Sequence, residues 1–493
     1  MTPHSTAPRS HRTPTGHAVV IGGGMAGLLT TRVLADFFDQ VTVLERAPAA
    51  SGDRWRSGAP QARHPHLLLA RGRLILEGLF PGLHDDLRLA GTPVFDFGQR
   101  AAILTPAGPT PTVSTGIICQ SSSRPLLESL LHARVQALPG VTIRHSTTVT
   151  GLRFNPATTA VTGVTHTRRG TPAASNRVST ELEADLVVDA SGRSSRLPDW
   201  LAEHGLPRPR TTTVDPRIGY ATRRYTIPDT LTLDVDFLAE LTRAPHRSRG
   251  CFGLRIEDNQ FLLGLQGAGG DYPPHTEQEF AEFAASLHIG LPALLEHLTP
   301  SSPIYGHRDA PNRRHHYERL RPWPTGLVVL GDAACVFNPV YAQGITVAAL
   351  HALALRDLLT RTHPADRTTA LAAFQRRQAR ITAWPWLLST CLDHAWQPQP
   401  PTLTDKVTAR VLDALLNSLP GSPAMFTRFF RVLHMLTGPH TFLHPAALAR
   451  TATHLRHRPP AAQREPTAVA VQPTRRPAPR HGTQQPPDMG APR

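Results

Sequence analysis

A short apolar run that ends in a cluster of glycines is the feature that most restricts how this chain can fold. Residues 18–21 are typical of a buried strand, and an apolar stretch suited to a helix follows from about residue 25 to residue 38. Between them Gly22 permits a tight turn, Gly24 lets the backbone approach a pyrophosphate, and Gly27 lets helix and strand pack closely. The free N–H groups of the helix N-terminus favour phosphate. The pattern predicts a Rossmann-like dinucleotide site.

An acidic residue follows the next apolar strand. Glu45 comes eighteen residues after Gly27, close to the spacing of about 20 residues typical of the acid that binds ribose hydroxyls. Its carboxylate would repel a 2′-phosphate, which argues against NADP as the resident ligand. We expect the neighbouring Arg46 to face outward or towards the adenine.

A second strand–turn–helix pattern lies some three hundred residues further on. Residues 326–330 form a buried strand that runs into Gly331 and Asp332, and an alanine-rich helix is expected from about Gln343 to Leu359. Asp332 can accept hydrogen bonds from ribityl hydroxyls, and the N-terminus of this helix can point at the flavin edge that becomes negative on reduction. The two patterns together predict FAD.

These motifs resemble the FAD-dependent aromatic hydroxylase and epoxidase superfamily over roughly residues 17–365. The segment 123–128 is similar to the family's helix start, where an arginine (here Arg124) contacts the flavin side of the cofactor. The segment 185–196, with Asp189 and Gly192, is similar to the part that helps hold FAD and the visiting nicotinamide. The resemblance adds O₂ and NAD(P)H, or reduced flavin from a partner reductase, as expected co-reactants.

Three further segments are similar to bacterial epoxidases of polyether-antibiotic biosynthesis, which act on polyenes: residues 58–66, 219–223 and 312–341. Cys335 stands where the wider superfamily often has His, and the Gly-x-Asn that opens the following helix is here Gly344-Ile345-Thr346. This subgroup also lacks that His and Asn. The substitutions favour the subgroup, and they put in doubt any flavin contact that needs the Asn amide.

The residues expected to bind the cofactor come from all of these motifs. They are Gly22, Gly24, Met25, Ala26, Gly27, Glu45, Arg46, Arg124, Asp189, Gly192, Gly331, Asp332, Pro339, Gly344, Ile345 and Thr346. Candidates to line the substrate site are Arg63, His64, His66, Tyr220, Arg223 and Tyr341. His64 and His66 could instead cap a helix beginning there, and Arg223 could be a strand-surface residue.

The resemblance implies oxygen insertion by a flavin C4a-hydroperoxide. The cofactor performs the difficult step, so no catalytic side chain is required and no metal is expected. Epoxidation of a polyene or polyketide alkene is the first interpretation, and aromatic hydroxylation is the second. A flavin-dependent alkene reductase and a non-catalytic FAD-binding protein remain alternatives. Halogenases of this fold rely on a lysine in the first third of the chain. Lys406 is the first lysine here, so halogenation is not expected.

Composition fits a cytoplasmic enzyme. The four cysteines are scattered without metal or disulfide spacing, and no apolar stretch is long enough to span a membrane. The net charge of +15 is concentrated partly in the two ends, so nucleic-acid binding is not expected. A small hydrophobic substrate, either free or attached to a carrier, is the expected partner.

The predicted fold class is α/β: a Rossmann-like FAD-binding domain with an inserted antiparallel-sheet substrate domain and a C-terminal helical segment. The FAD-binding domain is discontinuous. Its expected segments are 17–82, 111–210 and 325–365, with 83–110 and 211–324 in the substrate domain, 366–456 helical, and 1–16 and 457–493 disordered. The helical segment is expected to pack on the core, with an apolar substrate tunnel and a membrane surface as alternatives.

Overall fold

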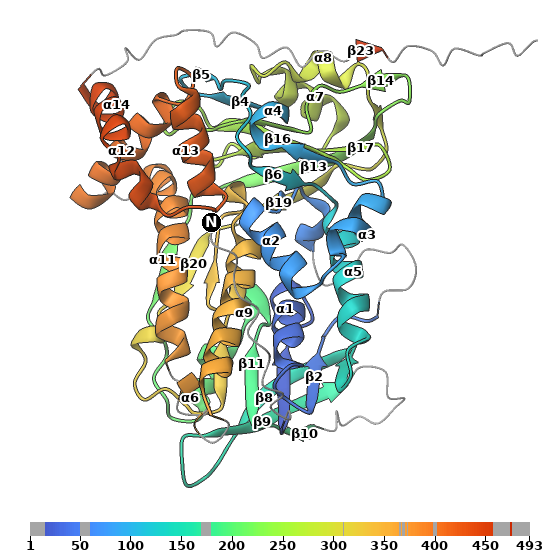
Figure 1. The fold of residues 1–493 in the computed structure, drawn as a ribbon, viewed down its shortest axis with the longest axis vertical. Helices are drawn as coiled ribbons and strands as arrows, with labels where there is room; N and C mark the ends of the chain where they lie inside the picture. Colours follow the sequence, from blue (N-terminus) through green and yellow to red (C-terminus); the bar gives the residue numbers. More distant parts are fainter. Residues whose placement is uncertain are drawn as a thin grey trace, which may run out of the picture.

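The computed structural model describes residues 15–49, 60–168, 179–308, 310–363, 366, 370–371, 373–397, 402–456 and 474–475. The two ends that we expect to be disordered, 1–16 and 457–493, therefore lie outside the described residues, except for residues 15–16 and 474–475. The mixed α/β class and the Rossmann-like unit are confirmed. Figure 1 shows a parallel sheet at one end of the long axis and a second, larger sheet at the other.

The parallel sheet is buried on both faces, as its apolar sequence requires. Val19 and Ile21 pack against a layer of strands on one face, whereas Ala18 and Val20 pack against helices on the other face. The sheet order is β21 (Leu327–Val329), β11 (Leu186–Asp189), β1 (His17–Ile21), β2 (Gln40–Leu44) and β7 (Val141–Arg144). The covering layers are α1 (Met25–Leu34), α2 (Ala70–Leu79), α5 (Arg124–Gln136) and α9 (Gly344–Arg361), and β8 (Thr147–Phe154), β9 (Val161–Arg168) and β10 (Thr180–Glu183).

The larger sheet combines the two segments expected to form a substrate domain. Most of its pairs are antiparallel, but β15 and β4 run parallel. Its order is β18 (Thr299–Pro300), β13 (Gly219–Thr226), β17 (Gln260–Gly267), β16 (Arg249–Ile256), β15 (Phe237–Glu240), β4 (Ala101–Thr105) and β5 (Gly108–Pro109), and β19 (Tyr305–Arg308) also pairs with β13. A small sheet consists of β12 (Thr211–Val214), β20 (Asn312–His315) and β22 (Cys335–Val336). Its middle strand β20 is seen between the levels of the two larger sheets in Figure 1.

The two faces of the larger sheet pack against different helices. Alternate residues of a strand point to opposite faces, and Phe261, Leu263 and Leu265 of β17 pack on α7 (Glu277–Ala285) and α8 (Leu291–Leu295). Leu262 faces the C-terminal helices instead. Because of this alternation, only every second side chain of a strand faces the C-terminal helices.

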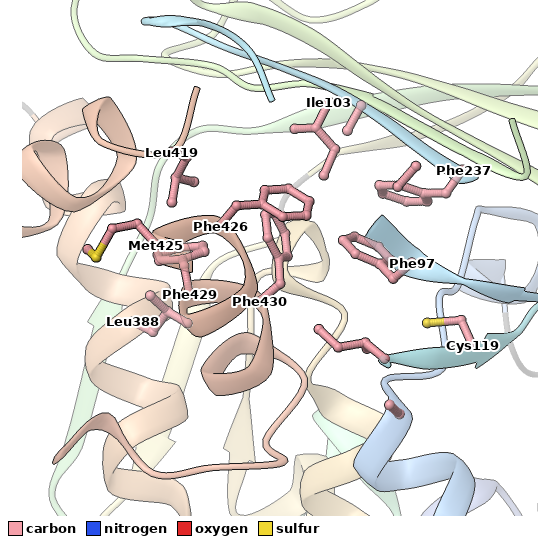
Figure 2. Close-up of a cluster of buried hydrophobic side chains, with 14 of the residues drawn as sticks. Phe97, Ile103, Cys119, Phe237, Leu388, Leu419, Met425, Phe426, Phe429 and Phe430 are labelled. Carbon is pink, nitrogen blue, oxygen red and sulfur yellow. The ribbon is translucent and has the colours of Figure 1, made fainter. Parts of the chain in front are cut away.

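The C-terminal segment is helical, as predicted, and packs on that second face. Its helices are α11 (Phe374–Asp393), α12 (Leu403–Asn417), α13 (Pro423–Leu433) and α14 (Pro445–Arg456). Figure 2 shows Phe426 and Phe430 of α13 directed towards Phe97 and Phe237 of the sheet region. The ring centroids of Phe97 and Phe430 are 4.9 Å apart. Each buried phenylalanine contributes roughly 2–3 kcal/mol through burial.

Several boundaries differ from the sequence expectations. No helix begins at His64 or His66, because helix α2 begins at Ala70. The first N–H groups of α2 are bonded by the C-terminal segment: Ala70 N donates to His434 Nδ1 and Arg71 N donates to the His434 carbonyl. A helix, α3 (Leu83–Leu89), lies where strands were expected before β3 (Val94–Asp96) and α4 (Phe97–Arg100). All four cysteines are buried and unpaired. Among the described residues, no helix is both long and apolar enough to cross a bilayer.

Candidate active site

The turn between β1 and α1 has the geometry that its glycines predict. Gly22 has φ +99°, and a Cβ there would lie 2.6 Å from the Ala190 carbonyl oxygen. A Cβ on Gly27 would overlap the Gly22 carbonyl, so Gly27 serves the packing of helix against strand. A Cβ on Gly24 would meet no protein atom within 4 Å. Gly24 therefore borders open space, which is what close approach of a ligand to the backbone requires.

That open space is a cavity of about 490 Å³ at the carboxyl edge of the parallel sheet. Such a volume is within the usual range for small-molecule sites. The distant motifs of the sequence meet in its wall. The predicted cofactor residues that line it are Gly22, Gly24, Met25, Ala26, Glu45, Arg46, Arg124, Gly192, Asp332, Pro339, Gly344 and Ile345.

Glu45 is held in place by backbone groups. Its carboxylate accepts hydrogen bonds from Gly23 N at 2.7 Å and from Ala47 N at 2.7 Å. These bonds fix the acid directly after β2, on the wall of the cavity. The position suits a carboxylate that receives ribose hydroxyls.

Asp332 makes no hydrogen bond to any described residue, although it lines the cavity. Burial raises the pKa of its carboxyl group, while the guanidinium groups of Arg124, Arg193 and Arg313 oppose that shift. The first residues of α9, Gly344 and Ile345, line the same wall. An unpartnered acceptor, a helix N-terminus and the open backbone at Gly24 together fit the ribityl–pyrophosphate part of FAD.

Four predicted cofactor residues are not on the cavity wall. Gly27 and Gly331 act through packing, since Gly331 has φ +61° and a Cβ there would press on Ala26. Asp189 is fully buried and accepts hydrogen bonds from Ser191 N, Ser191 Oγ and Ser195 Oγ. Asp189 therefore shapes the turn beside the cavity instead of facing it. Thr346 is buried, and a Cβ on Gly72 would meet its hydroxyl.

Arg124 is oriented by two protein partners. Its Nε donates to Glu128 at 2.8 Å, and its Nη1 lies 3.2 Å from His66 Nε2. His66 Nδ1 in turn bonds the His64 carbonyl at 2.7 Å. Burial is the main cause that lowers the pKa of His66 to about 3, so the ring is neutral and its Nε2 can accept from Arg124. Neither histidine caps a helix, because α2 begins at Ala70.

A second, more enclosed cavity of about 200 Å³ lies between the larger sheet and the C-terminal helices. Its wall is mainly apolar and includes Phe97, Phe237, Leu388 and Phe430. The two cavities have five wall residues in common: Pro65, Leu67, Asn338, Pro339 and Ala342. The two cavities therefore adjoin at these residues.

The substrate-site candidates are placed differently from one another. Tyr341 lines the second cavity, and His66 lines the first. His64 bonds Thr222 through Nδ1 at 2.7 Å, and the Tyr220 hydroxyl donates to Asn338 Oδ1 at 2.8 Å, so both lie close behind the cavity walls. Burial raises the pKa of Tyr220 and of Tyr341 and keeps both phenols neutral.

Two candidates point away from the cavities. Arg223 is an odd-numbered residue of β13 and forms an ion pair with Glu277 at the start of α7, on the opposite face of the sheet from Tyr220. The prediction that Arg223 lines the active site is therefore wrong. Arg223 lies on the opposite face of the strand, where its side chain is only 13% exposed. Arg63 is exposed, with its guanidinium carbon 4.5 Å from the centroid of the Tyr305 ring.

The sequence did not reveal a buried polar network that lies at the wall shared by the two cavities. Asp393 Oδ2 accepts from Asn312 Nδ2 at 2.7 Å and from Asn338 Nδ2 at 2.9 Å, and Asn312 Oδ1 accepts from Ser389. Burial is the main cause that raises the pKa of Asp393 to about 7. Asp393 lines the second cavity. A lone acid at the end of an otherwise apolar stretch, residues 384–392, was the available signal.

Comparisons with known proteins agree with this geometry. The chain is 32% identical over 452 residues to Protein Rv3254 of Mycobacterium tuberculosis, covering 90% of this chain and 94% of that protein. It is 29% identical over 377 residues to a kynurenine 3-monooxygenase of Salinispora tropica, covering 72% and 75%. The fold is similar to CmlS, a flavin-dependent halogenase, with a TM-score of 0.57 at 16% identity over 86% of this chain and 78% of that one. No protein-family model matches the chain.

Fold, cavity and relatives define an FAD-dependent enzyme of the flavin monooxygenase superfamily. Within it, the chain belongs to the family of Protein Rv3254. The narrower resemblance to polyene epoxidases is not among these findings.

Proposed function

We propose that this enzyme transfers one oxygen atom from O₂ to an apolar substrate held in the second cavity. The observation that carries the proposal is the wall shared by the two cavities, formed by Pro65, Leu67, Asn338, Pro339 and Ala342. A glycine-lined cavity suited to FAD, the more polar of the two, adjoins a more apolar and more enclosed one. This arrangement suits a reaction in which a cofactor must meet a hydrophobic molecule away from water.

FAD, when bound and reduced, would activate O₂ so that one oxygen atom goes to an electron-rich substrate and the other leaves as water, with the two electrons coming from the reductant. The protein's part is to bind and to exclude water. Glu45 and Asp332 offer acceptors to cofactor hydroxyls, and the N-terminus of α9 offers unpaired N–H groups. The phenylalanines of α13 and of the sheet close the substrate cavity.

Epoxidation of a polyene or polyketide alkene is the reaction we propose first. Its support is the similarity of residues 58–66, 219–223 and 312–341 to polyether epoxidases, together with a mainly apolar cavity wall that suits a hydrocarbon chain. Hydroxylation of an aromatic ring is the second candidate. The observation that favours it is the relationship to a kynurenine 3-monooxygenase, an aromatic oxygenase by its name.

The reductant in this proposal is NAD(P)H or reduced flavin from a partner reductase. Arg193 and Arg196 lie on the wall of the first cavity. Their positive charge suits an anionic nicotinamide cofactor or another anionic donor.

The test is turnover of the FAD-loaded protein under ¹⁸O₂ with NADH or NADPH, with and without an added flavin reductase. The substrates would be a panel of polyenes and phenols, with products analysed by mass spectrometry. A product that gains one ¹⁸O atom supports the proposal, and its position distinguishes epoxide from phenol. Reduction of a double bond without ¹⁸O incorporation would contradict it and favour an alkene reductase.

A further inference from the structure

One end of the apolar cavity contains a polar side chain with no protein partner. Gln266 lies on β17 between Gly250 of β16 and Tyr220 of β13, and its side chain lines the cavity. The residue is fully buried, and neither its Nε2 nor its Oε1 is bonded to any described residue. A buried amide with both atoms unpaired destabilises a protein unless a ligand or water completes its bonds.

Asp393 also lines this cavity. It is linked to the strand beside Gln266, because Tyr220, the β13 residue paired with Gln266, donates its hydroxyl to Asn338 Oδ1, and Asn338 Nδ2 donates to Asp393 Oδ2. Ala268, two residues after Gln266, packs in one cluster with Trp396, three residues after Asp393. The Asp393 carboxyl group accepts hydrogen bonds from Asn312 Nδ2 and Asn338 Nδ2, both at Oδ2. Within the described part of the chain, Oδ1 has no hydrogen-bond partner. An unpaired acceptor thus accompanies the unpaired amide.

Only certain ligand groups can satisfy both residues. A hydroxyl can accept from Gln266 Nε2 and donate to Asp393 Oδ1 at the same time. Above pH 7, where Asp393 is ionised, a carbonyl or ether oxygen can only accept, so the carboxylate would stay unpaired. An ammonium group would carry its charge into a mainly apolar cavity, which is costly.

We propose that the substrate is an apolar molecule bearing a hydroxyl group, a phenol or an alcohol, which binds between Gln266 and Asp393. That this ligand is the substrate depends on the proposed oxygenase function. The hydroxyl would anchor the molecule beside Asn338 and Pro339, the part of the wall that adjoins the cofactor cavity. Gln266 and Asp393 are thus specificity-determining residues.

The test uses FAD-loaded, oxidised protein and three probes that differ only at one position: 2-naphthol, 2-methoxynaphthalene and naphthalene. Dissociation constants come from equilibrium dialysis at pH 8, where Asp393 is largely ionised, and this measurement needs no turnover. We expect 2-naphthol to bind about tenfold more tightly than naphthalene, the ratio typical of one or two completed hydrogen bonds. Equal binding of all three probes, or binding of none, would overturn the proposal.

Gln266→Met keeps the length of the side chain and removes the amide. We expect it to weaken 2-naphthol binding about tenfold, to leave naphthalene binding unchanged and to raise Tm, because an unpaired buried amide is removed. Gln375→Met is the matched control. Gln375 of α11 is also buried with both amide atoms unpaired, but it lines neither cavity.

Gln375→Met should therefore raise Tm without changing the binding of any probe. If Gln266→Met lowered Tm, or if both variants changed 2-naphthol binding equally, the anchor would be refuted. Asp393→Asn should abolish the preference for 2-naphthol over 2-methoxynaphthalene, because an amide N–H can donate to either oxygen. Failure of the oxygenase function would instead appear as absent ¹⁸O incorporation while these binding differences persist.

Discussion

The two adjoining cavities are built in different ways. The first lies at the ends of parallel strands, where the backbone at Gly22, Gly24 and Gly344 borders the space and Glu45 is fixed by backbone N–H groups. The second is formed by side chains from a sheet and from α11–α13, which follow one another late in the chain. A backbone site can be recognised from a short motif. A side-chain site depends on how distant elements pack.

The variant with the largest expected effect, Gly24→Val, disrupts the first cavity alone. Gly24→Val would place a branched side chain in space that is open in the protein, where the pyrophosphate is expected. We expect the purified variant to retain less than about a tenth of the FAD of the parent while staying folded, since each lost 1.4 kcal/mol of binding is about tenfold. Flavin absorbance per protein and circular dichroism measure the two properties.

The matched control for that variant is Gly78→Val. A Cβ on Gly78, in α2, also meets no protein atom within 4 Å, but Gly78 is exposed and lines neither cavity. Normal FAD content in both variants would mean that the open space at Gly24 does not receive the pyrophosphate.

The second prediction concerns the packing of α13. Phe426→Ala removes a fully buried ring from the cluster that joins α13 to the sheet. We expect the free energy of unfolding to fall by about 3–4 kcal/mol, with FAD affinity of the folded protein unchanged. Denaturant titration and flavin binding below the unfolding transition measure these effects. A parallel loss of FAD affinity would show that the two cavities are not independent.

The third prediction tests the buried acid behind the shared wall. The pKa of Asp393 is raised to about 7 by burial, so the folded protein favours the protonated form. Its contribution to stability is present below the ordinary pKa of about 4 and is lost as pH rises through 7. Asp393→Asn has no such titration and keeps an acceptor for both asparagine amides.

The Tm of Asp393→Asn should therefore rise relative to the parent between pH 5 and pH 8. The difference should correspond to a few kcal/mol, on the order of 3 kcal/mol at the upper end. Thermal unfolding of both proteins across this pH range measures it. A difference in Tm that is constant with pH would mean that Asp393 ionises normally.

The smallest expected effect concerns Arg223. Its ion pair with Glu277 lies on the sheet face away from both cavities, and the Glu277 side chain is largely exposed. The Arg223 side chain is only 13% exposed and also donates to the Ser302 carbonyl, so Arg223→Gln should lower the free energy of unfolding by about 1–2 kcal/mol and leave FAD and probe binding unchanged. Calorimetry and equilibrium dialysis would check this. A strong loss of probe binding would restore Arg223 to the site.

The sequence by itself determined the cofactor half of this protein. The turn at Gly22, Gly24 and Gly27, the acid Glu45 and the pair Gly331-Asp332 could be interpreted directly, because each works through local backbone geometry at a strand end. The α/β class and the helical C-terminal segment followed from apolar periodicity. The face on which Arg223 lies could not be predicted, because strand alternation does not say which face adjoins the cofactor.

Only the tertiary structure decided the substrate half. It placed His434 at the N-terminus of α2, brought Asn312, Asn338 and Asp393 together from three segments, and left Gln266 unpaired in an apolar wall. None of these residues belongs to a motif with fixed spacing. Their roles arise from burial, which raises the pKa of an acid and makes an unpaired amide costly, and burial is a property of the packed chain.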